Sequence, residues 1–130
     1  MSINIPISYG ELLDKLSILE IKKNKITDDK KLVNVNFEFE TLENLAKNLK
    51  KTDDEKFTKF YKNLLKVNNS LWIIEDEIRI LEKKQLFNKD FISLARSVYI
   101  ENDKRFEIKN EINMYFKSDV VEQKQYIKYN

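Results

Sequence analysis

The 130-residue chain contains no cysteine and no histidine, and only one proline and one glycine. Without cysteine there are no disulfides and no thiolate chemistry, and without histidine the usual catalytic triads and the common zinc and haem sites are excluded. A single glycine also excludes phosphate-cradling loops, which need several. Any acid–base chemistry would therefore fall to Glu, Asp, Lys or Tyr side chains.

Long apolar runs and one-sided charge are missing as well. The longest unbroken apolar run, Leu71–Ile74, is far shorter than the ~20 residues of a membrane-spanning helix. Lys and Arg number 24 against 22 Asp and Glu, and both halves of the chain share them evenly, which argues against nucleic acid as a partner. With no basic-then-apolar leader pattern at the N-terminus, we expect a soluble, cytoplasmic, single-domain protein without a membrane partner.

The scarcity of Pro and Gly predicts an almost entirely helical chain. Capping boxes at Ser8 and Thr52, each followed three residues later by Glu, predict helix starts, and apolar residues spaced by threes and fours predict the helix bodies. We expect an extended lead-in containing Ile3, Ile5 and Ile7, a turn at Phe87-Asn88-Lys89 and a short C-terminal helix over 119–128. The predicted fold class is all-α, an antiparallel bundle of four main helices over about 8–26, 29–50, 53–86 and 90–117.

The stretch LWIIEDEIRILE, residues 71–82, places three consecutive acids in an apolar setting. At 100° per residue, Glu75 falls on the apolar side of the helix with Arg79 at its rim, whereas Asp76 and Glu77 point in two other directions. The acids are therefore not a three-carboxylate cluster. Glu75 is the one candidate catalytic group.

The helix over 90–117 also carries polar residues near the centre of its apolar arc, namely Asn102, Lys109 and Asn113. Buried polar groups need partners, because an unpaired amide costs about 1–3 kcal/mol. If the helices over 53–86 and 90–117 form an antiparallel hairpin, polar side chains meet at their contact. The predicted polar seam brings together Asn68, Glu75 and Arg79 with Arg96, Asn102, Arg105 and Lys109.

Two interpretations of this seam stay open. In the first, it is a closed network that fixes helix register, and the protein is a non-catalytic helical binding or assembly module, with homo-oligomerisation through the long helices. In the second, it is an open pocket of a small enzyme or ligand-binding protein. Glu75 would then be the catalytic group. The candidates for binding a small anionic ligand beside it are Arg79, Arg96, Asn102, Arg105 and Lys109.

Metal and cofactor sites have no support in the sequence. All-helical magnesium hydrolases use acids three residues apart, but this composition predicts roughly four such pairs by chance. The chain has three: Glu11/Asp14, Glu40/Glu43 and Asp119/Glu122. We therefore expect no metal and no cofactor.

Three stretches carry a family resemblance: SYGELLDKLSILEIKKNKI, LWIIEDEIRILE and FISLARSVYIENDKRFEIKNEIN. Together they resemble an uncharacterised family of small helical proteins of unknown function from bacteria and phages. The resemblance spans most of residues 8–113 and implies a helical fold, but no activity, ligand or functional residue. The abundance of Asn, Ile and Lys is typical of an AT-rich genome, and a marine bacterial or phage source is consistent with it.

Overall fold

The computed structural model describes all residues 1–130 and contains four helices and no strand. The helices are α1 (Tyr9–Lys25), α2 (Asp29–Thr52), α3 (Asp54–Lys83) and α4 (Lys89–Tyr115). The predicted all-α fold with four main helices is confirmed, and each predicted range agrees with the structure to within three residues at either end.

Polar side chains begin each helix, as expected where the first backbone N–H groups lack partners. The Ser8 hydroxyl accepts a hydrogen bond from the Glu11 N–H at 3.1 Å, so this predicted cap is confirmed. The prediction for Thr52 was wrong, because the N-cap of α3 is Asp53, whose carboxylate accepts from the Lys56 N–H. Thr52 is instead the last residue of α2, and its hydroxyl donates back to the Asn48 carbonyl.

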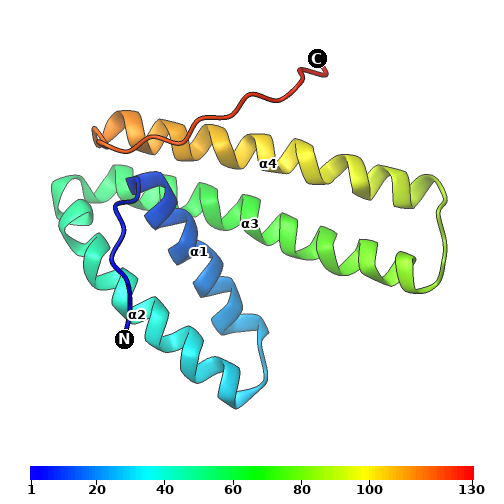
Figure 1. Cartoon of the computed structure of the whole chain (residues 1–130), viewed down its shortest axis with the longest axis horizontal. Coiled ribbons are helices and arrows are strands. Elements are labelled where there is room, and N and C mark those ends of the chain that lie inside the picture. The colour runs from blue at the N-terminus through cyan, green and yellow to red at the C-terminus, as the bar shows by residue number, and fades with distance from the viewer.

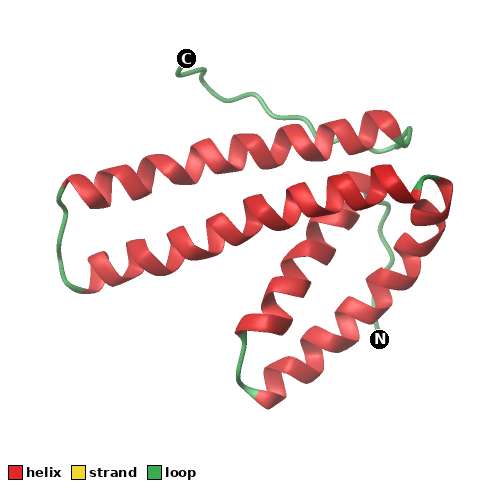
Figure 2. Ribbon diagram, turned by 180° about the vertical axis from the view of Figure 1, so that it is seen from behind, coloured by secondary structure: helices red, strands yellow, loops and turns green.

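The helices form two hairpins, α1–α2 and α3–α4, which pack together at one end and diverge toward the other (Figures 1 and 2). We call the packed end the base; it contains α1, α2, residues 54–69 of α3 and residues 101–115 of α4. The remainder of the long hairpin, residues 70–100, extends beyond α1 and α2, and we call it the arm. The base therefore has four helices in section, whereas the arm has two.

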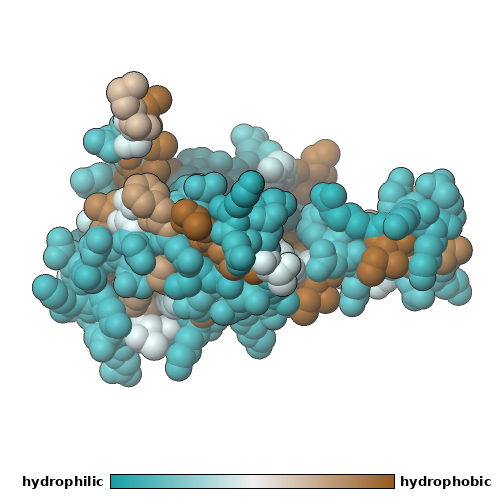
Figure 3. All heavy atoms as spheres, turned by 90° about the horizontal axis from the view of Figure 1, so that it is seen from below, coloured by the Kyte–Doolittle hydropathy of each residue, from teal (hydrophilic) through white to brown (hydrophobic).

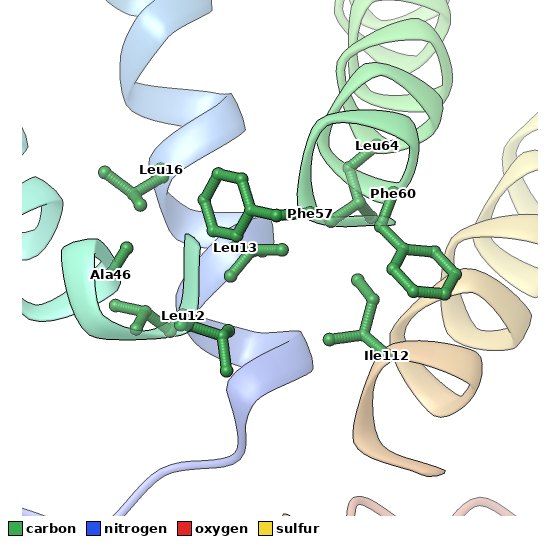
Figure 4. Packing of buried hydrophobic residues seen from close by; sticks show 9 residues of the cluster. Leu12, Leu13, Leu16, Ala46, Phe57, Phe60, Leu64 and Ile112 are labelled. Carbon is green, nitrogen blue, oxygen red and sulfur yellow. The ribbon is translucent and has the colours of Figure 1, made fainter. Parts of the chain in front are cut away.

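The hydrophobic core lies entirely in the base. Side chains from all four helices meet there, with Leu13, Leu64 and Ile112 completely buried (Figure 4). α1 contacts each of the other three helices, as expected from a helix that is apolar nearly all round. The core cluster consists of Leu12, Leu13, Leu16, Ala46, Leu49, Phe57, Phe60, Leu64 and Ile112.

Both ends of the chain are non-helical. The lead-in before α1 leaves Ile3 and Ile5 exposed, and only Ile7 packs against the core. The predicted helix over 119–128 was wrong. Lys117 adopts the left-handed conformation (φ 56°) and the Ser118 N–H donates to the Asn113 carbonyl at 2.8 Å, a turn that ends α4 and reverses the chain.

The C-terminal tail, residues 118–130, then runs back along α4 (Figure 1). Its successive side chains contact successively earlier parts of α4. The Glu122 carboxylate lies against Lys109, the Lys124 ammonium lies over the Phe106 ring, and the Tyr129 hydroxyl donates to Asp103. Beyond Ser118 the tail is held by these side-chain contacts and makes no backbone–backbone hydrogen bond.

Candidate functional site

A buried polar cluster occupies the base where α1 crosses α3 and α4. Asn68 of α3 is 4 % exposed, and its amide donates to the Asp14 carboxylate at 2.8 Å and to the Ser17 hydroxyl at 2.7 Å. Arg105 of α4 donates to the Asn68 carbonyl oxygen at 3.4 Å, and its Nε lies 4.0 Å from the Asp14 carboxylate. The buried Asp14 carboxylate thus accepts a hydrogen bond from α3 and has a cationic side chain of α4 nearby.

A second group of charges surrounds Lys109, which is 5 % exposed. Its ammonium lies 2.8 Å from the Glu11 carboxylate and 2.6 Å from the Glu122 carboxylate of the tail. Burial alone would lower the pKa of Lys109, but its hydrogen bonds to the two carboxylates outweigh burial and raise that pKa. Burial alone would raise the pKa of Glu11, and the hydrogen bond and charge of Lys109 outweigh it and lower that pKa.

The only glycine allows α1 and α4 to approach this closely. The Gly10 N–H donates to the buried Asn113 side chain at 2.7 Å, which satisfies one of the free donors in the first turn of α1. A Cβ at this position would lie 2.5 Å from the Lys109 carbonyl oxygen. Gly10 is thus required for close contact between the start of α1 and the end of α4.

The polar seam predicted from the sequence is only partly assembled. Asn68, Arg105 and Lys109 do meet polar partners, but the acids come from α1 and the tail: Glu11, Asp14 and Glu122. Glu11 could be expected among them, because a helix that is apolar nearly all round must bury some of its polar groups. Nothing in the sequence predicted Glu122, since the tail was expected to be helical.

Glu75 does not belong to this buried cluster, and its predicted position on the core side was wrong. Its side chain is 53 % exposed and accepts a hydrogen bond from Arg79, which is 79 % exposed, at 3.1 Å. That prediction, made from an angle of 100° per residue, assumed that the apolar stripe of α3 faces a core along its whole length. In the arm only α4 packs along α3, while α1 diverges from it (Figure 1), so Glu75 beside the stripe is exposed. Arg96 is exposed as well.

An open cleft of about 500 Å³ lies in the fork between α1, α3 and α4. Four of the sequence-predicted site residues line it, namely Glu75, Arg79, Asn102 and Arg105, whereas Arg96 and Lys109 do not. The remaining lining residues are Ile18 and Ile21 of α1, Asn68, Leu71, Trp72 and Asp76 of α3, and Val98 of α4. The cleft thus has apolar walls with charged side chains among them, and the roles of its lining residues stay predictions.

The arm exposes many of its apolar side chains. None of residues 70–100 is buried, although the segment is rich in large apolar side chains. Figure 3 shows hydrophobic atoms breaking the hydrophilic surface over the extended part of the molecule. The most exposed large apolar residues of the arm are Ile73, Ile80, Leu86, Phe87, Ile92 and Tyr99. No helix is both long enough and apolar enough to cross a lipid bilayer.

Comparison with known proteins places the chain in a family. It belongs to the family of unknown function DUF6165, whose model matches residues 3–129. No curated protein and no solved structure matches the chain.

Proposed function

We propose that this member of a family of unknown function is a non-catalytic assembly module that associates with further copies of itself through the arm. The observation that carries the proposal is that no residue of the arm is buried, whereas the base closes a compact core. Exposed large apolar side chains are costly in water, and when they gather on one element they indicate an interaction surface. The arm is such an element.

The outer side of α3 in the arm combines apolar and acidic residues. Ile73 and Ile80, 42 % and 52 % exposed, lie seven residues apart and therefore on one face of the helix. Between them, Asp76 and Glu77 occupy the neighbouring positions on the same surface, three or four residues from each isoleucine. This side of the arm, the α3 edge, is an apolar stripe with negative charge beside it.

The α4 edge of the arm has the same apolar spacing with the opposite charge. Ile92 and Tyr99, 57 % and 43 % exposed, are again seven residues apart. Arg96 lies between them and Lys89 lies one turn before Ile92. A second copy that sets its α4 edge against the α3 edge brings opposite charges together, whereas contact between two like edges brings like charges together.

The charge balance of the two halves of the arm supports this pairing. Residues 70–82 carry four acids against one arginine, and residues 83–100 carry four bases against one acid. A contact between two different edges is heterologous, so the copies form a closed ring or an open chain.

Sedimentation velocity over a concentration series tests the proposal. We expect species heavier than the 15.7 kDa monomer at the higher concentrations. The double substitution Ile73→Asp and Ile80→Asp puts charge on the exposed apolar stripe and is expected to leave only monomer. A wild-type chain that remains at monomer mass throughout the series would overturn the proposal.

A charge exchange makes the test specific to the two edges. Glu77→Lys alone and Arg96→Glu alone should each weaken association, because each places like charges together. Mixing the two variants should restore it, since the altered edges then attract each other. The matched control is Glu38→Lys on the exposed surface of α2, which should associate as the wild type does. Failure of the mixture to associate would contradict edge-to-edge pairing.

A further inference from the structure

The cleft between α1, α3 and α4 contains hydrogen-bond donors without protein partners. Arg105 makes one hydrogen bond, at 3.4 Å to Asn68, although a guanidinium has five N–H donors. The Asn102 amide and the Trp72 indole N–H make no hydrogen bond within the chain, although both side chains are half-buried. Three donor groups from two helices are thus available at one cavity.

The acids near the cleft restrict which ligand these donors would accept. Asp14 lies beneath Arg105 and neutralises part of its charge, since its carboxylate is 4.0 Å from Nε. The Glu75 carboxylate is already paired with Arg79, and Asp76 lines the cleft without an ion pair. A dianion would meet repulsion from Asp76, whereas a single carboxylate matches the one incompletely paired guanidinium.

The walls of the cleft favour an apolar body on that ligand. The apolar lining of the cleft consists of Ile18 and Ile21 of α1, Leu71 and Trp72 of α3, and Val98 of α4. A volume of about 500 Å³ lies within the range of small-molecule sites. Apolar walls with a few polar groups are the usual composition of such sites.

We infer that the cleft binds a carboxylate joined to an aromatic or branched aliphatic group, with Arg105 and Asn102 holding the carboxylate and Trp72 contacting the apolar part. The apolar part would displace water from Ile18, Trp72 and Val98. The inference does not depend on association through the arm.

Trp72 is the only tryptophan of the chain and lines the cleft, so its fluorescence reports occupancy directly. Phenylacetate and 4-methylpentanoate should give saturable changes in emission. Their neutral amides should bind at least about tenfold more weakly, because a hydrogen bond to a charged group is worth about 1.5–3 kcal/mol. Inorganic phosphate should give no saturable change. Equal responses to acid and amide, or none to either acid, would overturn the inference.

Substitutions identify the residues that hold the carboxylate. Arg105→Gln should weaken phenylacetate binding at least about tenfold, whereas Arg96→Gln, which alters an arginine outside the cleft, should leave it unchanged. If circular dichroism shows that Arg105→Gln does not fold, Asn102→Asp provides the second test, since its added negative charge should repel the ligand by a similar factor. Unchanged affinity in the folded variants would contradict the proposed site.

Two further measurements test whether binding in the cleft is independent of association through the arm, and which kind of carboxylate the cleft prefers. Repeating the titration in the Ile73→Asp and Ile80→Asp chain removes association through the arm, and the acid should still bind. The carboxylate could belong to a protein C-terminus or to a small acid. A short peptide ending in leucine, compared with its C-terminally amidated form, distinguishes these two sources. Tighter binding of the free peptide than of 4-methylpentanoate assigns the site to protein C-termini, and the reverse assigns it to small acids. Loss of acid binding in the arm variant would overturn the inference.

Discussion

The base and the arm are built from the same kind of helix but differ in what their apolar residues touch. Along α3 the apolar spacing continues without a break, yet Leu64 in the base is completely buried and Ile78 in the arm is only half-buried. The difference lies in the number of neighbouring helices. In the base α3 packs against α1, α2 and α4, whereas α4 alone accompanies it in the arm.

The polar residues of the two regions differ for the same reason. In the base, Asn68 and Lys109 are removed from water and bond to partners on other helices. In the arm, Glu75 and Arg79 pair along one helix and remain in water. Stability and helix register therefore depend on the base, which leaves the arm surface available for partners.

The largest expected effect comes from shortening the same kind of side chain in each region. Leu64→Ala should lower the free energy of unfolding by about 3–5 kcal/mol, because the cavity left in a closed core cannot collapse fully. Ile78→Ala in the arm should cost about 1 kcal/mol, since that side chain is already partly solvated. Urea unfolding of both variants measures the difference, and equal losses would contradict the division into base and arm.

Removing the buried cation of the base should have the next largest effect. Lys109→Met keeps the length of the side chain but leaves Glu11 and Glu122 without their shared partner. Both carboxylates are about one-third exposed, so we expect a loss of about 2 kcal/mol rather than the 3–5 kcal/mol of a fully buried pair. The matched control is Lys104→Met. The Lys104 side chain is 57 % exposed and pairs with Glu101 along one helix, so its removal should change stability little. Equal effects would show that Lys109 is no more important than a surface lysine.

The pH dependence of stability should also originate in the base. The pKa of Glu11 is lowered in the folded protein, so its contribution is present above its ordinary pKa and is lost as the pH falls through the folded value. The pKa of Lys109 is raised, so its contribution is lost at alkaline pH, as the pH rises through the folded value. Glu11→Gln should flatten the acid side of a plot of Tm against pH. An unchanged acid side would contradict the Glu11–Lys109 pairing.

The smallest effect is expected for the ion pair of the arm. Glu75→Gln should change the free energy of unfolding by no more than about 0.5 kcal/mol, because exposed pairs one helical turn apart contribute little. The same urea titration measures it. A loss above 1 kcal/mol would mean that Glu75 has a buried partner, for example in an associated form of the arm.

The helices were predictable from the sequence because Ser8 and the apolar spacing are local signals. The partners of the buried polar residues were not predictable from the sequence, because they depend on how the two hairpins cross. Lys109 was identified as a buried group in need of partners, but Glu122 reaches it only because the tail is extended. Glu75 was placed inward because a helical wheel cannot tell where neighbouring helices stop.

The predicted resemblance to a family of unknown function was confirmed, whereas the predicted bacterial or phage source stays a prediction. The predicted site residues are divided between two places. Asn68, Arg105 and Lys109 complete the buried cluster, and Glu75, Arg79 and Asn102 line the open cleft with Arg105. Arg105 is the residue common to both.

The long-range contacts of α1 have a consequence for the order in which the chain is made and folded. Gly10 bonds to a residue 103 positions later, and Glu11 to one 98 positions later. α1 leaves the ribosome first, yet Gly10 and Glu11 obtain these partners only when α4 has been synthesised. Until then only α1, α2 and α3 can pack together, so the base closes late and translation of α4 is the step that commits the chain to its native structure.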